Sequence, residues 1–391
     1  MKNLIKELAK SYAPEMIEIR RHLHSHPELS FQEYETSKFI QQQLDLYGVK
    51  YQAGIAGTGI IALIEGKRPS SKTIALRADI DALPITEAND VPYKSQHSGV
   101  MHACGHDVHT TCVLGATRIL QQIRDQFEGT IKVLFQPGEE KHPGGASIMI
   151  EEGALENPRP DAILGMHVQP TMEAGTLGFH AGEYMASADE IYITVKGKGG
   201  HAAQPQLTAD TILIASQLVV SLQQVISRNR NPFSPSVLSI CAFNGGFTTN
   251  VIPSEVKLMG TFRAMDETWR FKAHELIRQQ AIGIATAMGA EIDIEILVGY
   301  PTLYNNEAVT AKARGIAEDY LGQANVMDTE IRMGAEDFAF YSQIVPACFF
   351  RLGTGNAARG ITSGVHTPTF DVDEQAIETG MGTMAYLATQ F

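Results

Sequence analysis

Apolar residues recur at helical spacing through the first 47 positions of the chain. The series comprises Leu4, Leu8, Ile17, Ile19, Leu23, Phe39, Ile40 and Leu44. This period is typical of an amphipathic helix that buries one face. Proline disfavours helical backbone at the residue before it, so the pattern predicts a break at His26-Pro27.

Short apolar runs then alternate with helical patterns. The predicted strands cover 60–64, 74–76, 131–135 and 162–166, and the predicted helices cover 108–123 and 146–152. This rhythm is typical of an α/β domain with a largely parallel sheet. The rhythm returns near the end of the chain, where we expect a strand over 348–352 and helices over 307–320, 335–342 and 373–387.

The pattern changes from about residue 184. Two helical patterns, over 210–227 and 268–288, alternate with strand-like segments over 191–195, 237–242, 256–262 and 292–298. The resulting order β-α-β-β-α-β is that of a ferredoxin-like sandwich. We therefore expect residues 184–298 to form a domain inserted into an α/β domain built from residues 1–183 and 299–391.

Composition and charge exclude several classes of protein. The 391 residues are 44% hydrophobic and 19% charged, which is a globular composition. The formal net charge is −13, whereas nucleic acids and anionic membranes are bound by basic surfaces. No apolar run is long enough to span a membrane, and the N-terminal segment lacks the apolar region of a signal peptide. Four cysteines without CxxC spacing argue against a disulfide scaffold. We expect a cytoplasmic protein.

Carboxylates, imidazoles and one thiol follow the predicted strands of the α/β domain or precede its helix. Ligands of open α/β sheets bind at the carboxyl ends of the strands. Histidine and cysteine suit a borderline divalent ion, and carboxylates orient or bridge such ions. The sequence therefore predicts a metal site among Asp79, Asp81, His102, Cys104, His106, His109, Glu139, Glu140, His167 and His366.

Several of these residues also have an ordinary structural interpretation. A buried cysteine usually acts as a small apolar residue, but Cys104 lies in a loop beside His106, which favours a ligand. His102 and His109 are more simply explained as loop residues or as supports of the ligands. The adjacent carboxylates Glu139-Glu140 end an apolar strand, where they suit a division of roles between metal and water.

Two further histidine-containing segments are weaker signals. His22, His24 and His26 are spaced by two, which does not place them on one helical face. We assign them to a helix end and a loop. The segment Gly199-Gly200-His201 lies in the inserted domain, where a glycine pair lets the backbone approach a ligand closely, although a glycine-rich hairpin explains it equally well.

Ten segments of the chain together resemble one family. They are RRHLHSHPELSFQE, LRADIDALP, MHACGHDVH, FQPGEE, GMHV, GGHAAQP, TTNVIP, GTFRA, MGAEDF and GVHTP. They resemble the M20 metallopeptidase family, and more narrowly its amidohydrolase branch. This branch includes hippurate hydrolase, N-acyl-amino-acid deacetylases and indole-acetyl-amino-acid hydrolases. The segments span residues 20–368 in the family's order, and the Cys-Gly-His and Gln-Pro-x-Glu-Glu motifs together are highly specific.

The resemblance implies a zinc-peptidase-like (phosphorylase/hydrolase-like) catalytic domain with an inserted ferredoxin-like lid. It also implies two divalent metal ions per chain, which could be Mn, Zn, Ni or Co. Glu139 is implied as the general base. The implied metal ligands are Cys104, His106, Glu140, His167 and His366.

The resemblance assigns roles to further residues. Asp81 occupies the position of an aspartate that orients a ligand in the wider family. Asp79 takes the place of the wider family's first ligand, so the chain departs from the pattern there, and Cys104 compensates. His201 corresponds to a lid histidine that would stabilise the oxyanion. Two lid positions that handle the substrate's carboxylate or carbonyl are matched by Asn250 and Arg263.

These assignments predict a metal-dependent amidohydrolase that cleaves N-acyl-L-amino acids into a carboxylate and a free amino acid. The metals would polarise the amide carbonyl and activate water, and Glu139 would carry the proton to the leaving amine. An alternative is a metallo-carboxypeptidase or dipeptidase, which would need an acidic group for the substrate ammonium. A metal-binding protein without catalysis is disfavoured because Glu139 accompanies all five implied ligands. The resemblance also suggests a homodimer or higher homo-oligomer formed through the lid.

Overall fold

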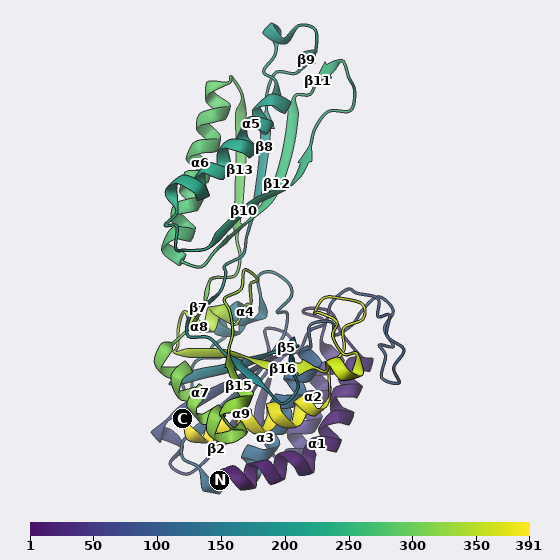
Figure 1. Ribbon diagram of the computed structural model, residues 1–391, viewed down its shortest axis with the longest axis vertical. Coiled ribbons are helices and arrows are strands. Elements are labelled where there is room, and N and C mark those ends of the chain that lie inside the picture. Colours follow the sequence, from purple (N-terminus) through teal and green to yellow (C-terminus); the bar gives the residue numbers. More distant parts are fainter. The chain divides into compact units, whose positions relative to one another are not determined.

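The computed structural model describes residues 1–391, which form two compact units (Figure 1). Unit 1 comprises Met1–Gly182, Tyr304–Glu330 and Asp337–Phe391. Unit 2 comprises Glu183–Leu303 and Ile331–Glu336. Unit 2 therefore interrupts the sequence of unit 1. None of the helices combines the length and the apolar character needed to cross a lipid bilayer.

A mixed eight-stranded sheet forms the centre of unit 1. The central strands β4, β3, β5 and β16 are parallel, as the alternating pattern predicts. The edges differ from a largely parallel sheet, because β2 runs antiparallel to β1 and β4, and β6 runs antiparallel to β16. In spatial order the strands are β1 (Lys50–Ile55), β2 (Gly59–Glu65), β4 (Thr130–Gln136), β3 (Thr73–Asp79), β5 (Ala162–Glu173), β16 (Ala347–Gly355), β6 (Leu177–Phe179) and β15 (Val326–Asp328).

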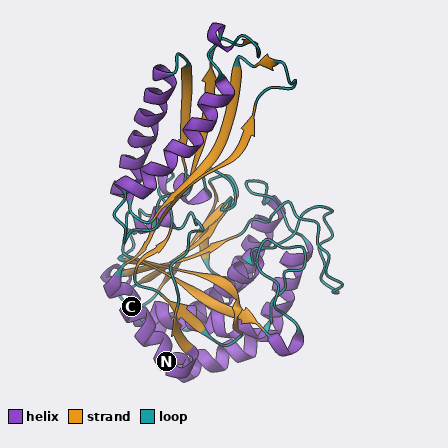
Figure 2. Ribbon diagram, turned by 45° about the horizontal axis from the view of Figure 1, so that its top comes forward, coloured by secondary structure: helices purple, strands orange, loops and turns teal.

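Helices cover both faces of this sheet (Figure 2). On one face, α1, α3 and α9 pack on one another and share a large apolar core with the strands. On the other face, α4 and α8 pack on each other and against β4 and β16. The helices of unit 1 are α1 (Lys2–Ser25), α2 (Tyr34–Tyr47), α3 (His106–Gln122), α4 (Gly145–Glu151), α7 (Glu307–Leu321), α8 (Ala339–Ser342) and α9 (Gln375–Gln390). The predicted break at His26-Pro27 is confirmed, since α1 ends at Ser25.

Unit 2 is an antiparallel sheet with two helices on one face. Its strands lie in the order β10 (Ser236–Asn244), β12 (Glu255–Ala264), β8 (Asp189–Lys196) and β13 (Glu291–Val298). The helices α5 (Thr211–Gln224) and α6 (Glu267–Ala287) each begin after an aspartate whose carboxylate accepts helix N–H groups. This order confirms the predicted ferredoxin-like sandwich. Short strands form two further pairs, β9 (Gly200–His201) with β11 (Val251–Ile252) and β7 (Gly182–Met185) with β14 (Leu303–Asn305).

The helix predicted over 335–342 is shorter than expected, because only Ala339–Ser342 is helical. Asp337 is drawn out of the helical pattern into a buried network. Its carboxylate accepts hydrogen bonds from Arg77 Nη2 at 2.7 Å, from Gln136 Nε2 at 2.7 and 2.8 Å, and from the Ala146 N–H at 3.0 Å. These contacts are worth more than one further helical turn, so tertiary structure overrides the local preference here.

Candidate metal centre

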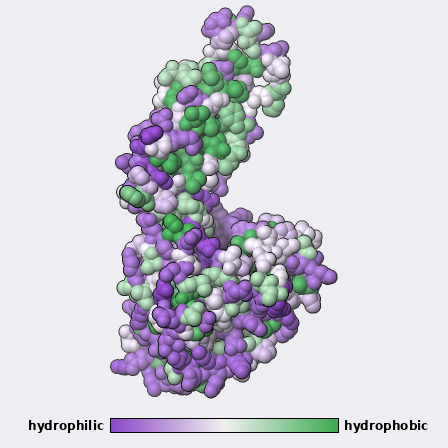
Figure 3. All heavy atoms as spheres, viewed as in Figure 1, coloured by the Kyte–Doolittle hydropathy of each residue, from purple (hydrophilic) through white to green (hydrophobic).

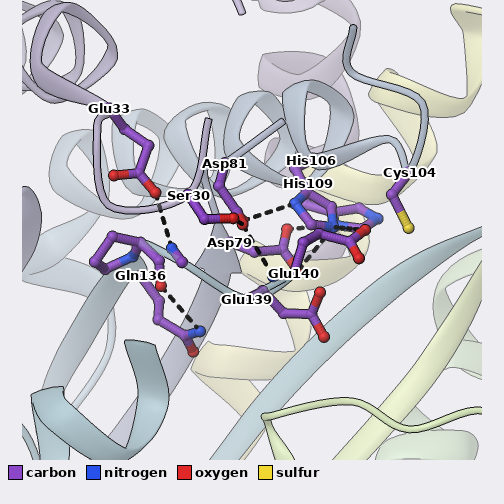
Figure 4. Close-up of polar contacts among 12 residues, drawn as sticks. Ser30, Glu33, Asp79, Asp81, Cys104, His106, His109, Gln136, Glu139 and Glu140 are labelled. Carbon is purple, nitrogen blue, oxygen red and sulfur yellow. Dashed lines mark hydrogen bonds and ion pairs between the residues drawn. The ribbon is translucent and has the colours of Figure 1, made fainter. Parts of the chain in front are cut away.

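Polar side chains from several separate segments of unit 1 converge beside the ends of β3, β4 and β5 (Figure 4). Fold topology explains this convergence, since these parallel strands present their carboxyl ends at one edge of the sheet. Asp79 is the last residue of β3, and His167 lies within β5. His106 is the first residue of α3, and Cys104 lies just before it. Glu139 and Glu140 follow β4, and His366 lies in the loop between β16 and α9.

Two backbone features set the direction of the predicted ligands. Gly105 has φ of +81°, and an added Cβ would lie 2.6 Å from Val168 Cγ2, so only glycine fits in the middle of the Cys-Gly-His motif. His366 also has a positive φ, +61°, which is strained for any residue other than glycine. Its N–H donates to the Ala103 carbonyl at 2.7 Å, which holds this loop against the start of the motif.

The five predicted ligands form one cluster. Cys104 Sγ lies 3.4 Å from His167 Nε2 and 3.3 Å from His366 Nε2. Glu140 Oε1 lies 3.0 Å from His366 Nε2 and 3.9 Å from His106 Nε2. In two overlapping groups, Cys104–His106–His167 and Cys104–Glu140–His366, the donor atoms all lie within 4.8 Å of one another. Such spacing suits ions shared between neighbouring side chains.

The donor atoms fit divalent cations in their hydrogen bonding as well as their spacing. His106 Nε2 is buried and has no hydrogen-bond partner. Glu140 Oε1 has no hydrogen bond either, and its charge faces only the imidazole rings of His366 and His106. A buried polar atom without a partner costs about 1–3 kcal/mol. Thiolate, imidazole and carboxylate donors together suit zinc and its neighbours in the transition series.

Asp81 sets the orientation of His106. Its Oδ1 lies 3.1 Å from His106 Nδ1, and its Oδ2 accepts from Ser30 Oγ at 2.7 Å and from the Glu140 N–H at 3.0 Å. A carboxylate that takes one ring nitrogen leaves the other free to bind a metal ion. This arrangement agrees with the orienting role that the family resemblance implies for Asp81.

Asp79 and His109 use their polar atoms on each other and on the protein. His109 Nδ1 lies 2.6 Å from Asp79 Oδ1, and His109 Nε2 accepts from the Val168 N–H at 2.9 Å. Asp79 Oδ2 accepts from Arg77 Nη1 at 2.7 Å. Both ring nitrogens of His109 are therefore engaged, which supports its interpretation as a residue that supports the ligands.

The electrostatics of the cluster favour added positive charge. Burial opposes the ionisation of Asp79, but His106, His109 and Arg77 outweigh it and hold its pKa well below the usual range. The Cys104 and Glu140 side chains raise the pKa of His366 to about 10. The His366 ring, which faces Cys104 and Glu140, therefore holds a proton at neutral pH. A divalent cation would meet the same electrostatic requirement.

Two other predicted ligands are shifted toward the neutral state by burial. Burial lowers the pKa of His167 well below its usual range, and His109 and Arg351 add to this effect. A neutral imidazole is the form that binds a metal ion. Burial, together with Glu140, raises the pKa of the Cys104 thiol. Since a metal ligand must be a thiolate, metal binding there would release a proton.

Glu139 lies beside the ligands and is itself buried. Its carboxylate, that of the next residue and the ring of His106 approach one another within 4.8 Å. Glu139 Oε1 lies 3.4 Å from the Asp337 N–H. Asp337 is fixed in turn by Arg77 and Gln136, as described for the fold. Glu139 therefore stands where a base could reach a water molecule held at the cluster.

The histidines that the sequence left as structural are more deeply buried than expected. His24 Nδ1 lies 2.7 Å from Asp107 Oδ2, and His24 Nε2 lies 3.3 Å from Glu87 Oε1. Asp107 also accepts from Arg20 Nε at 2.8 Å. His102 is buried as well, and burial lowers its pKa to about 4. His24 lies in the last turn of α1, as predicted, but its buried partner Asp107 was not predicted, because spacing along one helix carries no information about partners on α3.

The lid residues named by the resemblance occupy two places in unit 2. His201 on β9 pairs with Val251, and its Nδ1 accepts from the Ala203 N–H at 3.0 Å. Asn250 directly precedes β11, so His201 and Asn250 belong to neighbouring loops. Arg263 is half-buried near the other end of β12, roughly 26 Å along the strand from Glu255. Within unit 2, the structure thus brings together His201 and Asn250 but not Arg263.

Sequence reasoning missed several side chains that hold the cluster in place. Arg77 joins Asp79 to Asp337, and Ser30 and Glu33 reach the cluster from the segment before α2. All of them lie inside the family-like segments. No ligand spacing marks them, because each acts through another residue.

Comparison with known proteins agrees with this geometry. Residues 75–390 match the model of peptidase family M20/M25/M40. The N-acetyl-L-cysteine deacetylase of Bacillus subtilis is 40% identical over 363 residues, which cover 93% of this chain and 85% of that protein. The thermostable carboxypeptidase 2 of Saccharolobus solfataricus is 37% identical over 394 residues, with 100% and 98% covered.

A solved structure extends the similarity to the whole fold. The crystal structure of the YXEP protein of Bacillus subtilis, a dinuclear metal binding peptidase from the M20 family, has a TM-score of 0.85 and 36% identity to this chain. The similarity covers 97% of this chain and 98% of that one.

Proposed function

The chain belongs to peptidase family M20/M25/M40 and is a hydrolase of amide bonds, and on this premise we propose that its substrates are N-acyl-L-amino acids. The products would be a carboxylate and a free amino acid. The observation that carries the proposal is the cluster in unit 1, where five donor side chains lie in overlapping groups next to a buried Glu139, and where one of them, His106, has a buried Nε2 without a hydrogen bond. The deacetylase relative supports an acyl group on the substrate nitrogen.

We include two divalent metal ions in this proposal. Cys104, His106, Glu140, His167 and His366 would hold them, since their donor atoms lie together and fit the softness of such ions. When bound, these ions would supply Lewis acidity to the scissile carbonyl and acidify water. Zn, Mn, Ni and Co all remain within the proposal.

The residues of the chain would divide the remaining work. Glu139 takes a proton from the attacking water and returns it to the leaving amine, which is the role of a general base and then a general acid. Asp81 keeps His106 in one tautomer and one orientation. His109 fixes Asp79, and Arg77 neutralises it. The roles of His201, Asn250 and Arg263 toward the substrate rest on the family resemblance.

An assay of product release tests the proposal. The metal-depleted protein is reloaded separately with Mn, Zn, Ni or Co and offered a panel of N-acyl amino acids and dipeptides. We expect metal-dependent release of free amino acid from N-acyl substrates, with acetyl, benzoyl and indole-acetyl groups compared. Glu139→Gln should keep its metal and lose about 10²–10⁴-fold in kcat. Parental activity in this variant would remove Glu139 from the mechanism.

The same panel decides the second candidate function. The carboxypeptidase relative favours a peptidase that acts on short peptides. A faster reaction with dipeptides than with every N-acyl amino acid would replace the first proposal by this one. A free substrate ammonium would also require an acidic partner, so capping the amine of the same dipeptide should then reduce kcat/KM.

We also propose a cytoplasmic homodimer or higher homo-oligomer formed through unit 2. The edge strand β10 exposes Val237 and Phe243, and α5 exposes Leu213 and Val220. Figure 3 shows hydrophobic side chains gathered over this part of unit 2. Edge strands and exposed apolar surface favour association. Light scattering after gel filtration tests this, and Val220→Glu should shift the mass toward the monomer.

A further inference from the structure

The segment before α2 holds a buried carboxylate that the proposed mechanism does not use. Glu33 is fully buried. Its Oε1 accepts from the N–H groups of Phe31 at 2.9 Å and Gly138 at 2.8 Å, and its Oε2 accepts from Thr58 Oγ1 at 2.7 Å. Gly138 directly precedes Glu139 and belongs to the loop that follows β4.

The carboxylate of Glu33 does not serve its own helix. Glu33 occupies the N-cap position of α2, yet its side chain accepts no hydrogen bond from the first turn. The first-turn N–H groups of Glu35 and Thr36 donate instead to Glu28, at 3.2 and 2.8 Å. An N-capping role therefore falls to Glu28, and Glu33 is left to hold the loop after β4 (Figure 4).

Both residues whose N–H groups bind Glu33 have positive φ, and in Phe31 this conformation is strained. Phe31 has φ of +64°, which is a genuine outlier for a bulky residue. Gly138 has φ of +61°, and an added Cβ would lie 2.4 Å from Phe31 Cζ. The Phe31 ring thus covers Gly138 while Glu33 binds the N–H groups of both residues. Such strain persists only where the surroundings over-determine it, and it concentrates at functional sites.

A second contact fixes the other side of Glu139. The Glu140 N–H donates to Asp81 Oδ2 at 3.0 Å, and Ser30 Oγ donates to the same oxygen at 2.7 Å. The backbone N–H groups of the two residues that flank Glu139 are therefore both held, that of Gly138 by Glu33 and that of Glu140 by Asp81, which Ser30 binds in turn. Figure 4 shows both links reaching the loop from the same side.

We propose that Glu33 and Ser30 are positioning residues, whose hydrogen bonds to the loop after β4 and to Asp81 aim Glu139 and Glu140 at the metal cluster. The inference rests on the roles proposed for Glu139 and Glu140. A carboxylate is suited to the task, because an ionised acceptor binds two N–H groups more strongly than a neutral one. The cost of burying that charge also argues against a purely structural role, which a neutral side chain could fill.

Three variants and one matched control test this proposal. Glu33→Ala removes all three contacts. Glu33→Gln keeps an amide oxygen for the two N–H groups and places its NH₂ where Thr58 Oγ1 can accept. Glu35→Ala is the matched control, since it removes a carboxylate from the exposed side of the same helix. Ser30→Ala removes the hydroxyl that holds Asp81.

The main readout is metal affinity, which needs no substrate. Cobalt is titrated into the metal-free proteins, and the thiolate-to-metal absorption band reports binding. We expect Glu33→Ala to bind about 10–100-fold more weakly than the parent. Its kcat should fall by a similar factor while KM stays close to the parent value. Glu35→Ala should match the parent in both. Glu33→Gln should lose less than Glu33→Ala, because its neutral amide oxygen accepts from the same two N–H groups more weakly than the carboxylate. Ser30→Ala should lose several-fold in affinity.

Parental metal affinity and kcat in Glu33→Ala would overturn the proposal. A loss in Glu33→Gln as large as in Glu33→Ala would also overturn it, because the geometry predicts that the amide replaces the carboxylate. Should Glu33→Ala fail to fold, Ser30→Ala decides, and parental affinity there contradicts the proposal. If the parent binds cobalt but hydrolyses no substrate, the proposed function fails while the affinity series still tests the positioning role.

Discussion

Each unit of the molecule contains a buried ionic cluster, and the two differ in how completely their charges are paired. In unit 2, Asp189 accepts from Arg270 Nε at 2.9 Å, from His274 Nε2 at 2.9 Å and from the Gly299 N–H at 3.1 Å. Arg270 also donates to Glu267 and to the Gly299 carbonyl. His274 and Arg270 hold the pKa of Asp189 below its usual value against the effect of burial.

The cluster in unit 1 is less completely paired, since His106 Nε2 and Glu140 Oε1 have no hydrogen bond. Asp79 has Arg77 as a cationic partner, but the Glu140 carboxylate faces only two imidazole rings, that of half-exposed His366 and, at 3.9 Å, that of His106. A thiol lies among these groups. The comparison teaches that burial of charge alone does not mark a functional site. The informative feature is a buried acidic cluster whose partners are incomplete, because a cation completes it.

Removal of metal is the strongest way to separate the two clusters. A chelator should abolish amide hydrolysis, and reloading with a divalent ion should restore it, since the cluster in unit 1 needs a cation. Unit 2 should not respond. The single tryptophan, Trp269, is buried in α6 next to Arg270, so its fluorescence reports unit 2 alone. Full activity in demonstrably metal-free protein would contradict this prediction.

Breaking the paired cluster should instead cost stability. Arg270→Met leaves Asp189 buried without its main cation, and such a change typically costs about 3–5 kcal/mol. The free energy of unfolding is measured with urea, followed by Trp269 fluorescence. Added metal should not restore the loss. As a control, the double variant Asp189→Leu with Arg270→Met should lose less than the single one. A loss under about 1 kcal/mol in Arg270→Met would show that the Asp189 cluster does not stabilise the fold of unit 2.

Glu33 is a buried carboxylate of unit 1 that has hydrogen bonds but no cationic partner, so its effect on stability should depend on pH. Burial, with Asp81 nearby, raises its pKa from 4.5 to about 6. The folded chain therefore holds this proton more tightly than the unfolded chain, and stability falls as the pH rises from about 4.5 to about 6. A shift of this size corresponds to about 2 kcal/mol.

Comparison with Glu33→Gln isolates this contribution, because the amide does not titrate. The variant should gain about 2 kcal/mol relative to the parent between pH 4.5 and pH 7. Urea unfolding of both proteins at the two pH values measures the difference. A difference that stays constant with pH would mean that Glu33 does not change protonation between the folded and unfolded states over this range.

The sequence predicted the fold and the composition of the cluster well, because both leave local signals. Apolar periodicity located the central strands, and the ligand types at strand ends located the cluster. The start of α8 was mispredicted, because Asp337 is held by Arg77 and Gln136, which lie far away in the sequence. The antiparallel edges of the sheet likewise depend on pairing, which periodicity does not specify.

The supporting residues could not be assigned roles from the sequence for a related reason. Glu33 and Ser30 lie in a segment whose family resemblance is visible, yet their partners are a peptide N–H and an aspartate more than 50 residues away. Every residue except proline carries a backbone N–H, so the sequence does not mark which one binds Glu33. The burial of His24 beside Asp107 was missed because these two side chains lie 83 residues apart in the sequence.

The smallest expected change in stability concerns Glu140, whose substitution removes a charge from the incompletely paired cluster of unit 1, as Arg270→Met does from the paired cluster of unit 2. Glu140→Gln also removes one charge, but from a group that carries surplus negative charge and is partly exposed at the rim. Less repulsion offsets the lost ion pair with His366, so the metal-free protein should change in stability by under about 1 kcal/mol. Cobalt affinity should nevertheless fall further than the 10–100-fold typical of residues behind the ligands. Urea unfolding and cobalt titration of the same preparation give both numbers. A stability loss like that of Arg270→Met, with cobalt affinity retained, would mean that Glu140 holds the fold rather than an ion.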